Sequence, residues 1–149
     1  MVFTDGACQG NPGPGGWAWA VPGPGGGQSD ARWASGAEAH TTNQRMEVMA
    51  ALRALEALEG PVEVVSDSTY VVNCFKQRWW VKWEANGWLN SKREQVANQD
   101  LWRPLLAEVC GRGDVCFRWV KGHSGQPMND LVDRLAVEAA ARQCGGTSW

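Results

Sequence analysis

The feature that most constrains the fold is the change, near residue 43, from strand-like to helical patterns. Before it, residues 22–27 consist only of Pro and Gly and separate two strand-like segments, 17–21 and 31–39. Such a stretch predicts a hairpin turn. With the apolar run at residues 1–5, it predicts an antiparallel meander of three strands, whose first connection is a Gly- and Pro-rich loop over residues 6–16.

The rest of the chain alternates between helical and strand-like patterns. Apolar residues at three- and four-residue spacing predict a helix over residues 43–58, with Thr42 or Asn43 as its N-cap. Strands are predicted at 62–67 and 115–120, and helices at 68–76, 99–110 and 129–143. This order predicts an α/β protein with a mixed five-stranded sheet, its first three strands antiparallel, flanked by helices. We expect one domain over residues 1–144 and a short flexible tail at 145–149.

Length and composition fit a single folded domain. The chain has 149 residues, of which 44% are hydrophobic and 20% charged, which suits one compact unit. No run approaches the roughly 18 apolar residues of a membrane span, and the first residues lack the pattern of a signal peptide. The five cysteines show no metal or redox spacing, so we expect free thiols in a reducing compartment, the cytoplasm.

Four acidic residues are candidates for a functional site. Asp5 and Asp67 end apolar strands, Glu47 lies near the start of the first long helix, and Asp133 lies near the apolar face of the last helix. Buried acids need a positive partner, and an all-oxygen ligand set suits Mg²⁺. Two such ions about 4 Å apart stabilise the attacking and leaving oxygens of a phosphoryl displacement. Taken singly, each acid could equally be a turn, capping or solvated residue.

Four blocks of sequence decide between these interpretations. They are TDGACQGNPGPGG (4–16), TTNQRMEVMAALRALEAL (41–58), SDSTYV (66–71) and WVKGHSGQPMNDLVDRLA (119–136). In residues, order and separation, the chain resembles type 1 ribonuclease H over essentially its whole length. The resemblance implies the ribonuclease H-like fold and an endonuclease that hydrolyses the RNA strand of RNA–DNA hybrids, leaving 5′-phosphate and 3′-hydroxyl ends. It also implies two Mg²⁺ ions, replaceable by Mn²⁺, held by Asp5, Glu47, Asp67 and Asp133.

The resemblance also implies roles for two residues near the last helix. His123 lies in a Gly-flanked loop, and a histidine whose pKa lies near the working pH suits proton transfer. An exposed loop histidine without a role is the plain alternative, but His123 matches the family's mobile catalytic histidine. We expect it to shuttle protons or assist product release rather than bind metal. Asn129 matches an asparagine that positions the site or its nucleophilic water.

A larger set of residues matches the family's contacts to the hybrid. The 2′-hydroxyl distinguishes RNA from DNA, and amide side chains can donate to it and accept from it. The residues expected near the RNA strand are Cys8, Gly10, Asn11, Asn43, Gln44 and Thr69. Those expected near the DNA strand are Tyr70, Trp79 and Ser91, with Thr42 and Asn98 in a phosphate pocket. Packing in the core is the better interpretation for Trp83, Trp88, Trp102 and Trp119.

The chain departs from the family's pattern at three places. Either Trp79 or Trp80 could face the DNA strand, because the helix before them is one residue longer than usual. His40 stands where the phosphate pocket often has an arginine. The basic segment is weaker than in strongly basic members of the family: residues 76–93 carry five basic residues but also one acid, Glu84, a local balance of +4 in a chain of net charge −2. We therefore expect weak, salt-sensitive binding of the hybrid.

Two other classes of function stay open. One is a catalytically silent module that binds hybrids, against which the presence of all four acids speaks. The other is a DNA-directed nuclease of the same superfamily, against which the amide residues and the Gly-His-Ser-Gly loop speak. Since no further domain is evident, we expect a free-standing monomer without a protein or membrane partner.

Overall fold

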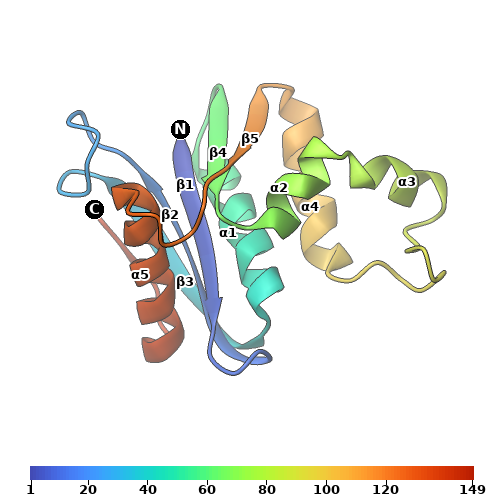
Figure 1. The fold of residues 1–149 in the computed structure, drawn as a ribbon, viewed down its shortest axis with the longest axis horizontal. Coiled ribbons are helices and arrows are strands. Elements are labelled where there is room, and N and C mark those ends of the chain that lie inside the picture. Colours follow the sequence, from blue (N-terminus) through green and yellow to red (C-terminus); the bar gives the residue numbers. More distant parts are fainter.

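A mixed six-stranded sheet runs through the computed structural model, which describes all residues 1–149 (Figure 1). The strands β1, β2 and β3 pair antiparallel, while β4 pairs parallel with β1, and β5 parallel with β4. This confirms the predicted α/β fold with its initial antiparallel meander. The strands are β1 (Val2–Cys8), β2 (Gly13–Val21), β3 (Arg32–Thr41), β4 (Val62–Ser66), β5 (Val115–Trp119) and β6 (Gly146–Thr147), in the order β5-β4-β1-β2-β3-β6.

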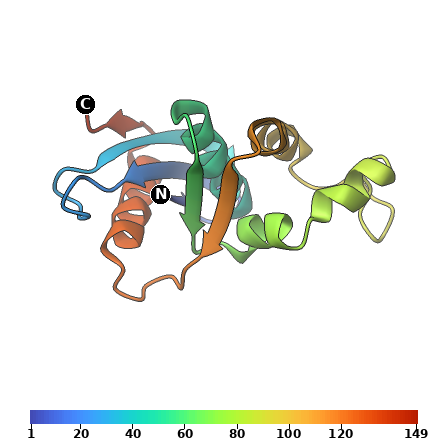
Figure 2. The same cartoon turned by 90° about the horizontal axis from the view of Figure 1, so that it is seen from above.

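Helices cover both faces of the sheet (Figure 2). Helix α5 (Pro127–Arg142) packs on β1, β2 and β3, while α1 (Asn43–Ala57) packs on β1 and β2 and is backed by α4 (Gln99–Arg112). Successive strand residues point to opposite faces, and accordingly Val2 belongs to the core beneath α1 and Phe3 to the core beneath α5. The central strands are therefore buried on both sides.

The loop after β1 is shorter than the sequence predicts. Residues 6–8 and 13–16 belong to strands, so only residues 9–12 form the loop. A Cβ added at Gly6 would lie 2.4 Å from backbone atoms of α1, and one at Gly16 would lie 2.3 Å from Ala136 O of α5. These glycines thus permit close helix–sheet packing rather than a turn. As a further correction, Asp5 lies within β1, opposite Ala18, and not at its end.

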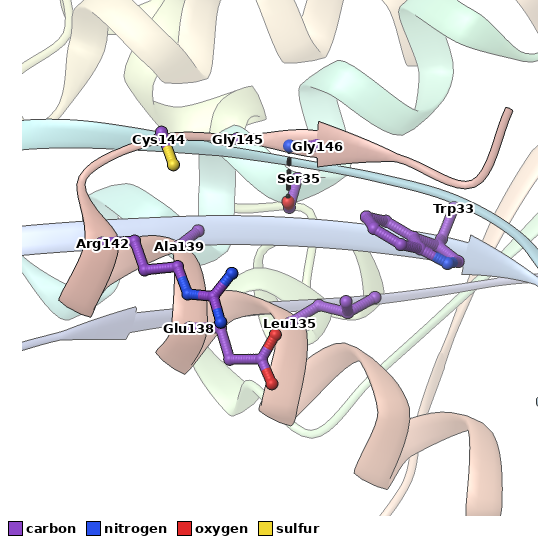
Figure 3. A pocket seen from close by; sticks show the side chains of 9 residues that line it. All are labelled: Trp33, Ser35, Leu135, Glu138, Ala139, Arg142, Cys144, Gly145 and Gly146. Carbon is purple, nitrogen blue, oxygen red and sulfur yellow. Dashed lines mark hydrogen bonds between the residues drawn. The ribbon is translucent and has the colours of Figure 1, made fainter.

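The C-terminal residues add a strand that the sequence did not predict. The two-residue strand β6 pairs antiparallel with β3, and Gly146 N donates a hydrogen bond of 3.1 Å to Ser35 Oγ (Figure 3). Beyond it, the guanidinium of Arg32 lies 4.7 Å from the centre of the Trp149 ring. The expected count of five strands was one too few, because a strand of two residues has no periodicity to recognise.

The tryptophan-rich segment contains a short helix that the sequence patterns did not indicate. Helix α2 (Thr69–Lys76) is followed by α3 (Trp79–Ala85), and Arg78 between them has a left-handed backbone (φ 56°). The α3 segment projects past the β5 edge of the sheet (Figure 1). Trp102 and Trp88 are buried as expected, but the prediction for Trp119 was wrong, since this residue is 47% exposed. None of the helices has the length and apolar character needed to cross a membrane.

Candidate active site

The register of two parallel strands brings the first pair of acids together. Thr4 of β1 is level with Ser66 of β4, so the next residues, Asp5 within β1 and Asp67 just after β4, lie at the same height. Asp5 comes two residues after Phe3 in the strand, so its side chain points to the same face of the sheet, the one covered by α5. Asp133, on α5, is half-buried above this face. Three of the four candidate acids thus converge on one side of the sheet.

Glu47 reaches the same region from α1, which covers the other face of the sheet. The N-cap of α1 is Thr42, one of the two residues predicted for that position, and its Oγ1 accepts a hydrogen bond of 3.2 Å from Arg45 N. One turn later the carboxylate of Glu47 accepts hydrogen bonds from Ser68 Oγ at 2.6 Å and from Asn43 Nδ2 at 2.9 Å. Ser68 is also the N-cap of α2. The start of α2, directly after Asp67, therefore holds Glu47 in place.

The acids share one electrostatic environment without a basic partner. Asp5 is 5% exposed. Its burial, and next the charge of Asp67, raise the pKa of Asp5 from 3.8 to about 9, with Asp133 and Glu47 adding to the shift and a hydrogen bond from Gly6 N opposing it. Burial also raises the pKa of Glu47, against its hydrogen bonds. None of the four acids forms an ion pair.

The chemistry of these residues fits a divalent cation, although the coordination shell is not preformed. No three of the His, Cys, Asp and Glu side chains stand close enough together to hold a metal ion. Like charges repel, which keeps the carboxylates apart. Even so, four buried or half-buried carboxyl groups that lack a basic partner are a set of oxygen donors that suits a divalent cation.

The loop before α5 borders this cluster. A Cβ at Gly122 would lie 2.8 Å from Asp67 Oδ2, so a larger residue there would press on the carboxylate. Trp119 Nε1 donates a hydrogen bond of 3.0 Å to the Asp67 carbonyl. Apart from the glycine itself, no pattern in the sequence predicts these two contacts of Asp67. The next residue, His123, is exposed and has a left-handed backbone (φ 55°).

The residues expected near the RNA strand gather around the start of α1. Asn11 Oδ1 accepts a hydrogen bond of 2.9 Å from Asn43 N, which joins the 9–12 loop to the helix. Cys8 Sγ donates to the carbonyl of Thr41 at 3.4 Å. Gly10 has a left-handed backbone (φ 71°). Gly10, Gln44 and Thr69 are all exposed.

The residues expected near the DNA strand are brought together only in part. The rings of Tyr70 and Trp79 lie 6.2 Å apart, whereas Trp80 packs on Phe75 at 5.7 Å. Trp79 is thus the tryptophan on the Tyr70 side. Ser91 lies in an exposed loop beyond α3 and makes no hydrogen bond to this group.

Two other features complete the description of the site. Asn129 is 2% exposed, and its Oδ1 has no hydrogen-bond partner. A buried amide oxygen without a donor is costly.

Away from the acids, a pocket lies between α5 and the strands β3 and β6 (Figure 3). It contains none of the candidate site residues, being lined by Trp33, Ser35, Leu135, Glu138, Ala139, Arg142, Cys144, Gly145 and Gly146.

Solved structures define the class of this fold. LC9-RNase H1, a type 1 RNase H with the type 2 active-site motif, superposes with a TM-score of 0.79 at 32% identity, covering 99% of this chain and 73% of that one. LC11-RNase H1, solved in complex with an RNA/DNA hybrid, superposes with a TM-score of 0.69 at 22% identity, covering 95% of this chain and 96% of that one. The fold is therefore that of ribonuclease H.

Sequence comparison narrows the class to a family. The RNase H family model matches residues 1–141. A ribonuclease H of Moorella thermoacetica is 52% identical over 142 residues, covering 94% of this chain and 90% of the relative. The chain belongs to the RNase H family, and as an enzyme it is an endoribonuclease.

Proposed function

We propose that this protein hydrolyses the RNA strand of RNA–DNA hybrids by two-metal-ion catalysis, leaving 5′-phosphate and 3′-hydroxyl ends. The observation that carries the proposal is the buried carboxyl of Asp5, surrounded by three further acids and by no basic side chain. A protein keeps such an arrangement at a cost to its stability, and the cost is understandable where a cation must bind. The similarity to LC11-RNase H1, which was solved with a hybrid, supports the substrate.

In this proposal Asp5, Glu47, Asp67 and Asp133 hold the divalent ions, with Mg²⁺ as the natural metal and Mn²⁺ as a substitute. Bound ions would stabilise the charge on the attacking and leaving oxygens. The chain's own residues prepare the site for them. Ser68 and Asn43 hold the carboxylate of Glu47, so that one ligand is oriented before the metal binds.

Other side chains would orient the substrate. The amides of Asn11, Asn43 and Gln44 can both donate to a 2′-hydroxyl and accept from it, and Cys8, Gly10 and Thr69 would be further contact positions. Tyr70 and Trp79 offer an apolar wall for a deoxyribose, which lacks that hydroxyl. Thr42 and Asn98 would bind a phosphate, and Ser91 and Asn129 complete the expected contacts.

His123 would move protons rather than bind metal. It is exposed on the loop whose Gly122 abuts Asp67, so its imidazole can visit the site and leave it again. A histidine in such a position suits proton transfer near neutral pH. We expect His123→Ala to slow hydrolysis without abolishing it. The five free cysteines fit a reducing compartment, and we propose a cytoplasmic monomer.

The proposal is tested with end-labelled RNA–DNA hybrid, double-stranded DNA and double-stranded RNA, each with Mg²⁺ or with EDTA. We expect cleavage of the hybrid alone and only with metal. A polynucleotide kinase should label the 5′ ends of the products only after phosphatase treatment, because those ends carry a phosphate. Cleavage of double-stranded DNA would favour the DNA-directed alternative. Binding of the hybrid without cleavage would favour the silent module.

A matched pair of variants on α5 tests the site itself. Asp133 faces the acid cluster, whereas Asp130, one turn earlier, is exposed. Asp133→Asn should lower turnover by at least about a hundredfold, since loss of a charged contact to the transition state costs several kcal/mol. Asp130→Asn should leave turnover unchanged. Equal activity of the two variants would remove Asp133 from the site.

A further inference from the structure

A two-pronged ion pair fixes one arginine beside the start of α1. Arg45 Nη1 donates to Asp100 Oδ1 at 2.9 Å, and Nη2 donates to Asp100 Oδ2 at 2.7 Å. The same Nη1 lies 3.4 Å from Asn98 Oδ1 and donates to it as well. Such paired hydrogen bonds set the orientation of the guanidinium plane as well as its position. Arg45 is therefore held in one geometry against the first turn of α4.

The side chain of Asn98 makes hydrogen bonds that its place at the start of a helix does not require. It precedes α4 as the N-cap and has a left-handed backbone (φ 65°), but its side chain does not cap the helix. Its Oδ1 accepts from Arg45, and its Nδ2 donates to Tyr70 Oη at 3.2 Å. The side chain thus connects the arginine to the tyrosine.

One hydrogen-bonding capacity of the Tyr70 hydroxyl, that of its hydrogen, is not used within the protein. Its oxygen accepts hydrogen bonds from Asn98 Nδ2 at 3.2 Å and from Trp102 Nε1 at 2.8 Å. A phenolic oxygen has two lone pairs and one hydrogen. Because both lone pairs are engaged with protein donors, the remaining hydrogen is directed away from them, and the half-buried ring presents it at the surface. A group that only accepts hydrogen bonds, such as a phosphate oxygen, is its natural partner.

We propose that Arg45, locked by Asp100, is a positioning residue that orients Asn98 and, through it, aims the Tyr70 hydroxyl hydrogen at a backbone phosphate of the bound hybrid. This inference rests on the proposed function, which places nucleic acid against Tyr70. It explains why an acid, Asp100, stands beside a phosphate contact: its charge is matched by Arg45 and does not repel the substrate.

Steady-state kinetics on a hybrid separates positioning from charge. Arg45→Lys keeps the positive charge but cannot hold Asp100 and Asn98 at once, and Arg45→Gln removes the charge. We expect both variants to raise KM by about tenfold, with kcat within about twofold of wild type, the loss expected for one hydrogen bond to a charged group. KM does not depend on the amount of folded enzyme, so partial unfolding would lower only the apparent kcat.

The same helix supplies a matched control. Arg53 also binds a carboxylate, Glu56, with Nη1 and Oε1 2.7 Å apart on the outer surface of α1. Arg53→Lys should leave KM unchanged. If Arg45→Lys behaved like wild type while Arg45→Gln raised KM, charge alone would explain the effect and the positioning role would be refuted.

A double-mutant cycle tests the link to the tyrosine. Tyr70→Phe should raise KM by about tenfold, and the double variant Arg45→Lys/Tyr70→Phe should show about the same rise instead of about a hundredfold, because both changes remove one contact. A hundredfold rise would show independent effects and overturn the inference. If wild-type enzyme left the hybrid uncut, the proposed function would fail, and this inference with it. If wild type cut the hybrid but the cycle were additive, only this inference would fail.

Discussion

Replacing one buried carboxyl should make the metal-free protein more stable. Burial, the neighbouring charge of Asp67 and the other acids raise the pKa of Asp5 from 3.8 to about 9. For an acid whose pKa is higher in the folded state, the unfolded state loses the proton more readily. The contribution of Asp5 to stability is therefore full below pH 3.8 and is lost as the pH rises through 3.8 toward about 9.

The size of the effect follows from the same values. Each pH unit between 3.8 and the folded-state pKa costs about 1.4 kcal/mol. At about pH 7 the loss amounts to roughly 4 kcal/mol, and at about pH 4.5 to roughly 1 kcal/mol. Asn has the shape of Asp and keeps an acceptor for Gly6 N, which donates to Asp5 Oδ1 at 2.8 Å, but it carries no charge. Asp5→Asn should recover this energy.

The assay is urea unfolding in EDTA, followed by the fluorescence of the ten tryptophans, at about pH 4.5 and about pH 7. Asp5→Asn should exceed wild type by roughly 4 kcal/mol at the higher pH and by roughly 1 kcal/mol at the lower. Saturating Mg²⁺ should stabilise wild type and so reduce the difference in the free energy of unfolding between Asp5→Asn and wild type. The exposed Asp130→Asn serves as control. If Asp5→Asn were only as stable as wild type at neutral pH, or less stable, the reasoning would be refuted.

Three further predictions concern packing, substrate contact and charge. Gly6→Ala should destabilise the protein by about 3 kcal/mol, because its Cβ would meet the α1 backbone at 2.4 Å, whereas Gly25→Ala, in open space, should be neutral; urea unfolding checks both. Trp79→Ala should raise KM for the hybrid several-fold and Trp80→Ala should not, since only Trp79 lies beside Tyr70; the reverse result would assign Trp80 to the channel. If three basic residues of the 76–93 segment bind phosphates, hybrid affinity should fall about 40-fold between about 50 and about 200 mM salt, and an isotherm that barely moved would contradict this.

Much of the fold could be predicted because its signals are local. A turn made of Pro and Gly and the helical spacing of apolar residues need only neighbouring residues to be recognised. The errors arose where a distant partner decides the structure. Gly6 and Gly16 resemble loop glycines in the sequence, but they are strand residues that make room for α1 and α5. The strand β6 exists only because β3 offers an edge to pair with.

The candidate site divides in the same way. Each acid could be found from its place at a strand or helix, yet nothing local shows that Asp5 and Asp67 stand side by side, which follows from the pairing of β1 with β4. The link from Ser68 to Glu47 joins residues 21 positions apart, and the link from Arg45 to Asp100 joins residues 55 apart. Hydrogen bonds of this kind depend on how helices pack, and that arrangement leaves no periodic trace in the sequence.

The buried acids connect stability and function through one physical cause. Taking Asp5 out of water weakens its ionised form, and the nearby carboxylates weaken it further. The folded protein therefore gains most from a cation at the place where its charges are least tolerated, since a ligand that binds only the folded state stabilises it by the energy of binding. The hydrogen bonds from Ser68 and Asn43 act in the opposite sense on Glu47, because they favour its ionised form. Since burial and the neighbouring charges keep Asp5 protonated near neutral pH, we expect a cation that binds there to release this proton, which would couple the assembly of the site to pH.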